Sequence, residues 1–346
     1  MTTAYPIAVS QPRTQEHSMY IGVYNACLAD KPLGESLDVI TGLGLNSVEI
    51  NSGGFLPPIH LPVEELRASE DARQAYLGEF ASRGLTLTAL NCNGNPLHPR
   101  ADFPHRQDLL DSIDLAALLG VKRVVTMSGT PAGSPGGTNP VWNPLPWWSP
   151  LLDVRDHQWE VAVPFWKDVQ ARAAAADVRV AIEMHPGNIV FNPATMHRLA
   201  ESIGATHVGA EMDPSHLFWQ GIDPVLALKD LGSLVYCSAA KDTRINEAAK
   251  VNGVLDDRFT RVSEGEPGYL SLGGGTTLSG WPTNSSWDFV AIGKGHDVVF
   301  WTEFLRALQA IDPDLPCNIE HEDQELGQLE GLKFAADNML AAERAL

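Results

Sequence analysis

The sequence contains few cysteines and few basic residues. Its 346 residues include only four cysteines, Cys27, Cys92, Cys237 and Cys317, and none of them form a CxxC pair. This number and spacing exclude a disulfide scaffold and a thiolate zinc site. Lys and Arg total 24 against 43 Asp and Glu, which gives a formal net charge of -19. Because so negative a surface repels phosphate backbones and anionic membranes, we expect no nucleic-acid partner and no membrane partner.

Long apolar runs are also missing. No apolar run reaches the ~18 residues of a membrane span. Residues 1–18 lack a basic end followed by an apolar stretch, so they do not resemble a secretory signal. We therefore expect residues 1–18 to form a flexible N-terminal arm and the protein to be cytoplasmic.

Short apolar, β-branched runs alternate with longer stretches in which apolar residues recur every three or four positions. The pattern predicts strands at residues 19–25, 46–51, 85–91, 122–128, 178–184, 207–212, 233–239 and 316–320. It predicts helices at residues 33–43, 62–83, 106–119, 158–175, 193–203, 223–231, 299–311 and 324–344. No GxGxxG turn follows a strand, which favours a closed barrel over a dinucleotide-binding sheet. The expected fold is α/β: a (β/α)₈ TIM barrel forming a single domain over residues 19–346.

Two predicted connections are unusually long. Residues 129–157 follow the fourth strand and are rich in Gly, Pro and Trp, and residues 241–297 follow the seventh. Loops that follow barrel strands lie on the active-site face. Their tryptophans either cover a pocket, pack the loops against the barrel or form a subunit contact.

Acidic and imidazole side chains gather where the last four predicted strands end. These residues are Glu183 and His185, Asp213 and His216, Lys241 and Asp242, and Glu320, His321 and Glu322. The carboxyl ends of barrel strands converge on one mouth, where unpaired carboxylates would repel one another. Each residue alone is better explained as a solvated or ion-paired group, whereas the whole set indicates a bound divalent cation.

The chain resembles the xylose-isomerase-like TIM-barrel superfamily, in particular its sugar phosphate isomerase/epimerase group. The resemblance is carried by the segments IEMHPGNIVFNP, DPSHLFWQG, AKDTRIN, GKGHDVVFW and IEHEDQELGQLEGL. It implies metal-dependent proton abstraction next to a carbonyl, through an enediolate. It also implies that Glu183, Asp213 and Glu320 are metal ligands, and that His216 contacts the substrate or a metal-bound water.

The chain departs from the family pattern at the seventh strand. The family usually has a histidine two residues before the Lys-Asp pair, where this chain has Ala239, and Cys237 also replaces a frequent histidine. Either the site holds no metal, or another residue completes it. Our candidate is His296, whose alternative role is packing at the start of a helix. A set of Glu183, Asp213, His296 and Glu320 suits Mn²⁺, with Mg²⁺, Co²⁺ or Zn²⁺ less favoured.

The same mouth offers groups for catalysis. His185 is a candidate base, because an imidazole side chain suits that role at neutral pH, although Glu183 or Glu320 is an alternative. Lys241 either stabilises an oxyanion or pairs with an acidic neighbour, Asp242 or Glu211. We expect His321 and Glu322 to support Glu320 from behind. Asn91 and Asn93, after the third strand, are candidate donors to sugar hydroxyls or members of an Asn-rich turn.

The expected function is a divalent-metal-dependent sugar isomerase or epimerase. The main alternative is a lyase that uses the same deprotonation to cleave 3-oxo-C-glycosides, resembling the metal-bearing subunit of a C-glycoside deglycosidase with a small β partner subunit. An AP endonuclease-like nuclease and a non-catalytic sugar-binding protein are less favoured. No phosphate cradle or Arg cluster is evident, so we expect a free or oxidised sugar or glycoside as the substrate. We also expect a homo-oligomer.

Overall fold

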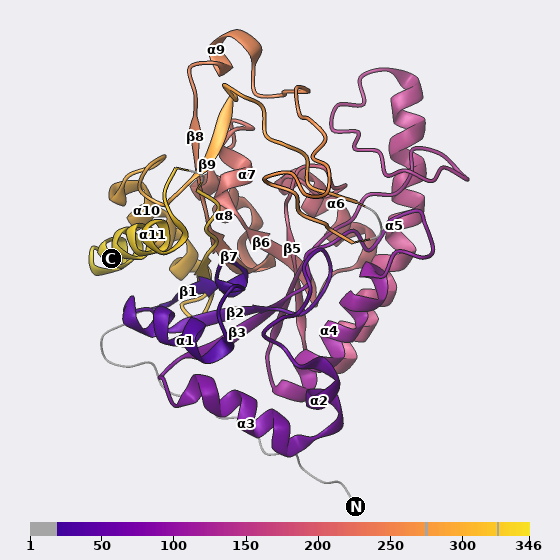
Figure 1. Ribbon diagram of the computed structural model, residues 1–346. Helices are drawn as coiled ribbons and strands as arrows, with labels where there is room; N and C mark the ends of the chain where they lie inside the picture. The colour runs from indigo at the N-terminus through magenta and orange to yellow at the C-terminus, as the bar shows by residue number, and fades with distance from the viewer. Residues whose placement is uncertain (1–18, 274–275, 324) are drawn as a thin grey trace, which may run out of the picture.

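The structure, a computed structural model, describes residues 19–273, 276–323 and 325–346. The expected N-terminal arm, residues 1–18, lies outside this range. Parallel strands form a closed barrel in the order β1-β10-β7-β6-β5-β4-β3-β2 (Figure 1). They are β1 (Tyr20–Tyr24), β2 (Ser47–Asn51), β3 (Thr86–Asn91), β4 (Arg123–Met127), β5 (Arg179–Glu183), β6 (Val208–Met212), β7 (Val235–Ala240) and β10 (Pro316–Ile319). The predicted TIM barrel is confirmed.

Burial of both faces of the strands explains their apolar composition. Every residue of β2, β6, β7 and β10 is buried, as is typical of parallel strands covered by helices. The barrel closes where β1 pairs with β10, with Tyr20 opposite Pro316. Gly22 permits the neighbouring contact with β2, because a Cβ atom there would lie only 2.0 Å from the carbonyl oxygen of Ser47.

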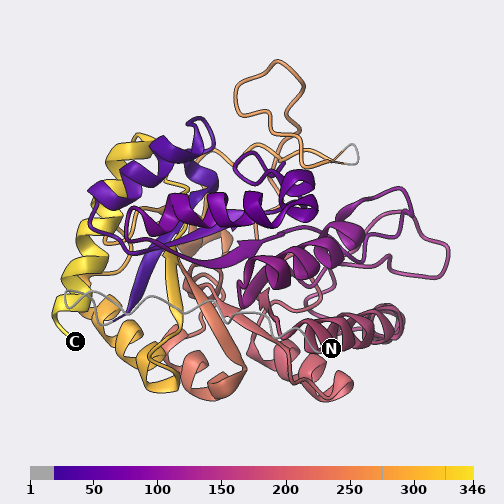
Figure 2. The same cartoon turned by 90° about the horizontal axis from the view of Figure 1, so that it is seen from below.

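Helices surround the strands, as the view from below shows (Figure 2). Their apolar faces cover the barrel; in α10, for example, Trp301, Phe304, Leu305 and Leu308 are completely buried. The longer helices are α1 (Leu33–Gly42), α3 (Glu70–Ala81), α4 (His105–Leu119), α5 (Ser149–Ala176), α6 (Pro193–Ile203), α8 (Pro224–Leu231), α10 (Val298–Ile311) and α11 (Gln328–Arg344). The shorter ones are α2 (Val63–Ala68), α7 (Pro214–Phe218), α9 (Ala249–Asn252), η1 (Asn25–Leu28) and η2 (Gly232–Leu234). Within the described ranges, no helix combines the length and apolar character needed to cross a membrane.

Two of the predicted helices differ markedly in extent from those of the structure. The single helix expected at residues 62–83 is divided into α2 and α3, because Ser69 adopts an extended conformation and its side chain caps α3 by accepting from the Ala72 N–H. Helix α5 begins at Ser149 rather than at residue 158, with a proline in its first turn. The long connection after β4 is therefore shorter than the sequence suggested.

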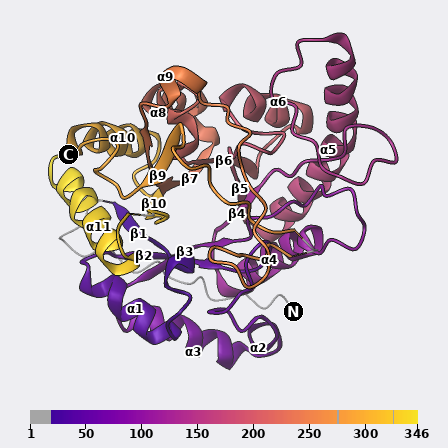
Figure 3. The ribbon, with the colours of Figure 1, turned by 45° about the horizontal axis from the view of Figure 1, so that its top comes forward.

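The long connection after β7 contains a two-stranded antiparallel sheet that the sequence did not predict. Strand β8 (Asp242–Ile245) pairs with β9 (Trp287–Val290), with Asp242 opposite Val290. Figure 1 shows β8, β9 and α9 standing above the barrel. The segment between β8 and β9 passes across the barrel mouth when the top of the molecule is tilted forward (Figure 3). We call residues 242–290 the hairpin insertion.

Candidate active site and metal centre

Three carboxylates from different strands meet at the barrel mouth. Glu183 is the last residue of β5, Asp213 follows β6 and Glu320 follows β10. One carboxylate oxygen from each lies within 4.8 Å of those of the other two. Glu183 and Asp213 are both 1% exposed. The structure thus brings together the three carboxylates that the sequence marked as metal ligands.

Asp213 is oriented by the helix that follows it. Its Oδ1 accepts a hydrogen bond of 2.8 Å from the Ser215 N–H and caps α7. Its Oδ2 is buried and has no hydrogen-bond partner among the residues that the structure describes. A buried carboxylate oxygen without a partner is costly, and a cation removes that cost.

His216, on α7, supplies the imidazole nearest to the carboxylates. Its Nε2 lies 3.0 Å from Oε1 of Glu183 and 3.3 Å from Oδ2 of Asp213. Ligand atoms that share an ion at ~2.1 Å stand about 3 Å apart in octahedral geometry. The spacing of these three atoms therefore fits a shared cation, as well as direct hydrogen bonding.

His185 lies beside His216 and lines the cavity above the carboxylates. The two ring centroids are 4.0 Å apart. Nδ1 of His185 contacts the carbonyl oxygen of Pro186. Because a carbonyl can only accept, this contact places the proton on Nδ1 and leaves Nε2 of the neutral ring able to accept a proton.

The structure does not bring His296 to the carboxylates. Its Nδ1 pairs with Oδ1 of Asp242 at 2.7 Å, and its ring stacks on Phe218 with a centroid distance of 3.6 Å. Oδ2 of Asp242 accepts from the backbone N–H groups of Gly293, Gly295 and His296. This buried carboxylate fixes the loop before α10, so His296 has the packing role that was the alternative to metal ligation. Among the described residues, the groups suited to hold a metal do not include it.

Lys241 is inserted between acidic side chains. Its Nζ lies 3.1 Å from Oε1 of Glu320 and 2.9 Å from Oε2 of Glu322, rather than pairing with Asp242 or Glu211 as one alternative held. Burial alone lowers the pKa of Lys241, but Glu320, Glu322, Asp213 and Glu183 together hold the pKa well above its usual value. The ammonium is charged and neutralises part of the cluster.

The three carboxylates differ in acidity. Burial opposes ionisation of Glu183, but the hydrogen bond from His216 and nearby positive charges lower its pKa to about 2. Burial raises the pKa of Asp213 to about 7. Burial and the adjacent carboxylates Glu322, Glu183 and Asp213 raise the pKa of Glu320 well above its usual value, although Lys241 opposes this. Without a cation, the cluster therefore retains protons near neutrality.

The two candidate asparagines have different roles. Asn93 donates from Nδ2 to Oε2 of Glu183 at 2.6 Å, and its Oδ1 has no hydrogen-bond partner in the described part of the chain. Asn91 instead donates to Oε1 of buried Glu49 at 2.7 Å. Asn93 lines the cavity, whereas Asn91 is not among the lining residues. Only Asn93 is placed to meet a ligand.

The residues after Glu320 do not form the expected support. Both ring nitrogens of His321 are buried without a hydrogen-bond partner in the described ranges, and the ring lies against Gly331 of α11. Glu322 supports Glu320 only indirectly, since both carboxylates contact Lys241.

A cavity of about 650 Å³ opens above the carboxylates. Its polar floor consists of Asn93, Glu183, His185, His216, Lys241 and Glu320, and much of its upper wall comes from the hairpin insertion. Sequence reasoning did not identify Trp281, Trp287 and Phe289 as individual site residues. The available signal was the tryptophan content of the connection after β7. It did not distinguish tryptophans that cover the cavity from tryptophans that only pack the loop against the barrel.

The donor set fits a divalent cation. It comprises three carboxylates and one neighbouring imidazole, and it includes a buried oxygen, Oδ2 of Asp213, without a hydrogen-bond partner in the described residues. Oxygen-rich sets with one nitrogen suit Mn²⁺ and Mg²⁺, and also accommodate Zn²⁺.

The comparison with known families agrees with this architecture. The sequence profile described as "Xylose isomerase-like TIM barrel" matches residues 37–338. The chain belongs to this family. It is also 34% identical over 316 residues to the Bacillus subtilis (strain 168) protein named "Uncharacterized protein YfiH", covering 90% of this chain and 95% of that protein.

Solved structures show the same fold at low sequence identity. The probable 3-DHS dehydratase AsbF from Bacillus anthracis superposes with a TM-score of 0.62 at 13% identity, covering 92% of this chain and 97% of that one. The 3-keto-D-glucoside 4-epimerase YcjR from E. coli gives 0.60 at 15% identity, with 95% and 100% covered. The IOLI protein with a bound zinc atom gives 0.59 at 18% identity, with 94% and 99% covered.

Proposed function

We propose that the protein is a divalent-metal-dependent isomerase or epimerase of a sugar or keto-sugar, acting by proton transfer next to a carbonyl. The observation that carries this proposal is the convergence of Glu183, Asp213 and Glu320, with ligand oxygens within 4.8 Å of one another. A divalent metal bound there supplies a Lewis acid that stabilises negative charge developing on a sugar oxygen. The related folds named above include an epimerase and a dehydratase of small oxygenated molecules.

Glu183, Asp213, Glu320 and His216 are the residues we propose as the holders of the metal. His216 takes the place that the sequence assigned to His296, because its Nε2 is beside two of the carboxylates. It compensates for Ala239, where the family usually has a histidine. Mn²⁺ remains the favoured ion for three oxygens and one nitrogen, with Mg²⁺, Co²⁺ and Zn²⁺ as alternatives.

His185 and Glu320 are the proposed proton carriers. Nε2 of His185 is free to accept the proton from the carbon next to the carbonyl and, once protonated, to return it to the neighbouring carbon, whereas Glu320, ionised as a metal ligand beside Lys241, is the alternative base. Lys241 stabilises negative charge on a substrate oxygen. Glu183 stays ionised and accepts a hydrogen bond from Asn93, while ligation of a metal by His216 and Glu183 would replace the hydrogen bond between them. Asn93 Oδ1 accepts from a sugar hydroxyl.

Elemental analysis of the purified protein and solvent deuterium exchange test the proposal together. We expect about one divalent metal per chain, and metal-dependent incorporation of deuterium next to the carbonyl of a keto-sugar or keto-glycoside. A metal-containing protein that exchanges no proton in any of a panel of such compounds would contradict it. A protein that binds no metal would instead support a non-catalytic sugar-binding role.

The lyase alternative uses the same deprotonation, followed by loss of a leaving group. The observation that favours it is the apolar upper part of the cavity, which suits an aromatic leaving group such as that of a 3-oxo-C-glycoside. Release of a free aglycone would identify this reaction. The net charge of -19 disfavours a nuclease. A binding assay that finds no salt-dependent DNA binding would exclude the nuclease alternative.

The expected homo-oligomer and the small β partner subunit also stay proposals. Trp147 and Trp148 are 81% and 74% exposed and offer an apolar surface for such a contact. Sedimentation of the wild-type protein and of a Trp147→Ser, Trp148→Ser variant tests whether this surface joins subunits.

A further inference from the structure

We propose that the cavity binds a two-part substrate: a sugar ring at the carboxylate floor, joined to an aromatic group bearing an oxygen substituent. The aromatic group lies against Phe259, Trp281, Trp287 and Phe289, which we call the aromatic wall. The substrate class is therefore an aryl-type glycoside rather than a free sugar or a sugar phosphate. This inference rests on the proposed function, because it assigns the sugar to the floor.

The aromatic wall is continuous from the barrel mouth to the floor. Phe259 packs edge-on against Trp281 with a centroid distance of 5.1 Å, and Trp281 meets Trp287 at 4.9 Å. Trp287 in turn meets Phe289 at 5.3 Å. A ligand extending outward from the floor therefore passes along this wall.

Phe289 joins the wall to the groups that the proposed reaction uses. Its ring lies 4.3 Å from Nζ of Lys241 and 5.5 Å from the ring of His216. The aromatic and catalytic parts are therefore adjacent sections of one cavity, and one ligand can occupy both.

The size and composition of the cavity disfavour a small polar ligand. Pockets of ~300–1,000 Å³ accommodate drug-sized molecules, and about 650 Å³ is more than a single hexose fills. Val254, Leu255, Leu270 and Leu278 add aliphatic surface to the upper part. A free sugar would leave this apolar surface in contact with water, whereas an aromatic group would cover it.

The charges of the lining disfavour a phosphate. Among the described residues that line the cavity, Lys241 is the only Lys or Arg, and it already pairs with Glu320 and Glu322. Asp256, in the upper part, is paired with Arg258, which is not among the lining residues. A phosphate in the upper part would therefore meet no free cationic side chain of the lining.

Buried polar atoms indicate that the aromatic group carries oxygen. Trp219 and Ser286 line the cavity and are only 6% and 1% exposed. Trp219 Nε1 and Ser286 Oγ have no hydrogen-bond partner within the described ranges. Trp219 also stacks on Trp287 with a centroid distance of 5.1 Å, so its indole adjoins the aromatic wall. A phenolic hydroxyl or carbonyl would satisfy such groups.

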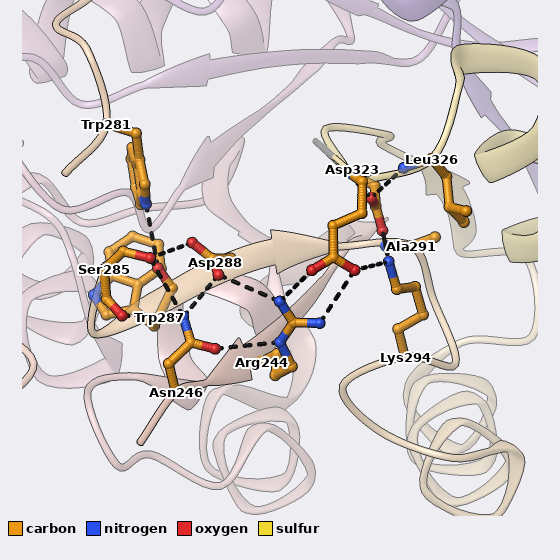
Figure 4. Close-up of polar contacts among 11 residues, drawn as sticks. Arg244, Asn246, Trp281, Ser285, Trp287, Asp288, Ala291, Lys294, Asp323 and Leu326 are labelled. Atoms are coloured by element: carbon orange, nitrogen blue, oxygen red, sulfur yellow. Dashed lines mark hydrogen bonds and ion pairs between the residues drawn. The ribbon is translucent and has the colours of Figure 1, made fainter. Parts of the chain in front are cut away.

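Polar contacts hold the aromatic wall in place (Figure 4). Asn246 of the hairpin insertion donates to Oδ2 of Asp288 at 2.7 Å and to the Ser285 carbonyl at 3.1 Å. Trp281 Nε1 donates to the Trp287 carbonyl at 3.3 Å. These contacts fix the segment that presents the two tryptophans.

A second set of contacts connects the hairpin insertion to the loop after β10. Arg244 of the insertion pairs with Glu325 at 2.7 Å. Lys294, in the loop that follows the insertion, pairs with Glu325 at 2.6 Å and with Asp323 at 2.8 Å. The loop that carries Glu320 and the hairpin that carries the wall are thus tied together. A preformed wall lowers the ordering cost of binding an aromatic ligand.

Isothermal titration of the metal-loaded full chain with two glucosides tests the inference. The probes are 4-hydroxyphenyl β-D-glucoside and methyl β-D-glucoside, which differ only in the aglycone. We expect the aryl glucoside to bind about 10-fold or more tighter, a difference of ~1.4 kcal/mol or more, because the aromatic wall removes the aglycone ring from water. Equal affinities would overturn the inference.

Two variants locate the contact. Trp281→Ala should reduce the affinity for the aryl glucoside to that for the methyl glucoside, without changing metal content. Phe334→Ala, in which the replaced side chain is 40% exposed on α11 and outside the cavity lining, should leave both affinities unchanged. If Trp281→Ala disturbs the hairpin, Leu255→Ser, at a side chain 64% exposed, should still weaken the aryl glucoside several-fold. Full aryl affinity in a folded Trp281→Ala protein, or in Leu255→Ser, would contradict the assignment.

Deuterium exchange separates this inference from the proposed function. Faster exchange into an aryl 3-keto-glucoside than into a methyl 3-keto-glucoside supports both. Equal exchange into the two supports the proposed reaction and overturns the aromatic subsite. Selective aryl binding without any exchange supports the subsite and removes the proposed reaction.

Discussion

Nε2 of His216 lies 3.0 Å from Oε1 of Glu183, so an imidazole from the helix after β6 reaches the carboxylate at the end of β5. The same nitrogen is 3.3 Å from Asp213. This placement provides a nitrogen donor from α7, although the seventh strand has Ala239 in place of a histidine. It also makes the proposed metal set testable without an activity assay.

His216→Ala should weaken metal binding by more than the ~10- to 100-fold that loss of a group behind a ligand costs, because a ligand at the ion itself is lost. His296→Ala is the matched control and should retain the metal, since His296 pairs with Asp242 and stacks on Phe218. Titration of the metal-stripped proteins with Mn²⁺ measures both. If His296→Ala lost the metal and His216→Ala retained it fully, His296 rather than His216 would be the nitrogen ligand.

Glu183→Gln, Asp213→Asn and Glu320→Gln should each remove both the metal and solvent exchange. Each variant replaces an anionic oxygen donor with a neutral amide of nearly the same shape. Glu247→Gln, at a side chain 86% exposed, serves as the control and should retain both properties. Metal content per chain is the readout; full occupancy in Asp213→Asn would speak against the cation beside its unpartnered Oδ2.

His185→Ala should keep the metal and lose catalysis. Removing a general base costs ~10²–10⁴-fold in rate, whereas His185 is not part of the proposed ligand set. The measurements are metal content and the rate of deuterium incorporation. A variant with unchanged exchange would transfer the role of base to Glu183 or Glu320.

In the metal-stripped protein, the contribution of Asp213 to stability should fall as the pH rises from about 4 to about 7, whereas His216, whose pKa burial lowers to about 3, acts in the opposite direction. Burial raises the pKa of Asp213 to about 7, whereas an unfolded Asp titrates near ~3.9. Between these values the folded state keeps a proton that the unfolded state has released, so this contribution falls with rising pH. Added Mn²⁺ binds the ionised form, and its stabilising effect should therefore grow over the same range.

Thermal unfolding at about pH 5.5 and about pH 7.5, with a chelator or with Mn²⁺, measures this dependence. Asp213→Asn should show a smaller pH dependence without metal and little stabilisation by Mn²⁺. A wild-type Mn²⁺ effect that is larger at the acidic pH would contradict the expected coupling of proton and metal.

The barrel could be predicted because its strands are short, apolar and separated by regular helical patterns. The break between α2 and α3 was missed because Ser69 lies within a continuous helical pattern, where a local capping contact changes the chain direction. The hairpin insertion was missed because β8 and β9 are four residues each and pair across about forty intervening positions.

The sequence by itself determined the TIM barrel and the meeting of Glu183, Asp213 and Glu320. Parallel barrel strands all end at one mouth, so position at a strand end is sufficient to place such residues. The tertiary structure alone decided which histidine and which asparagine reach that mouth. His216 faces Glu183, whereas His296 is held by Asp242 and Asn91 by Glu49. These orientations depend on partners far away in the chain, and residue type and local spacing contain no information about such partners.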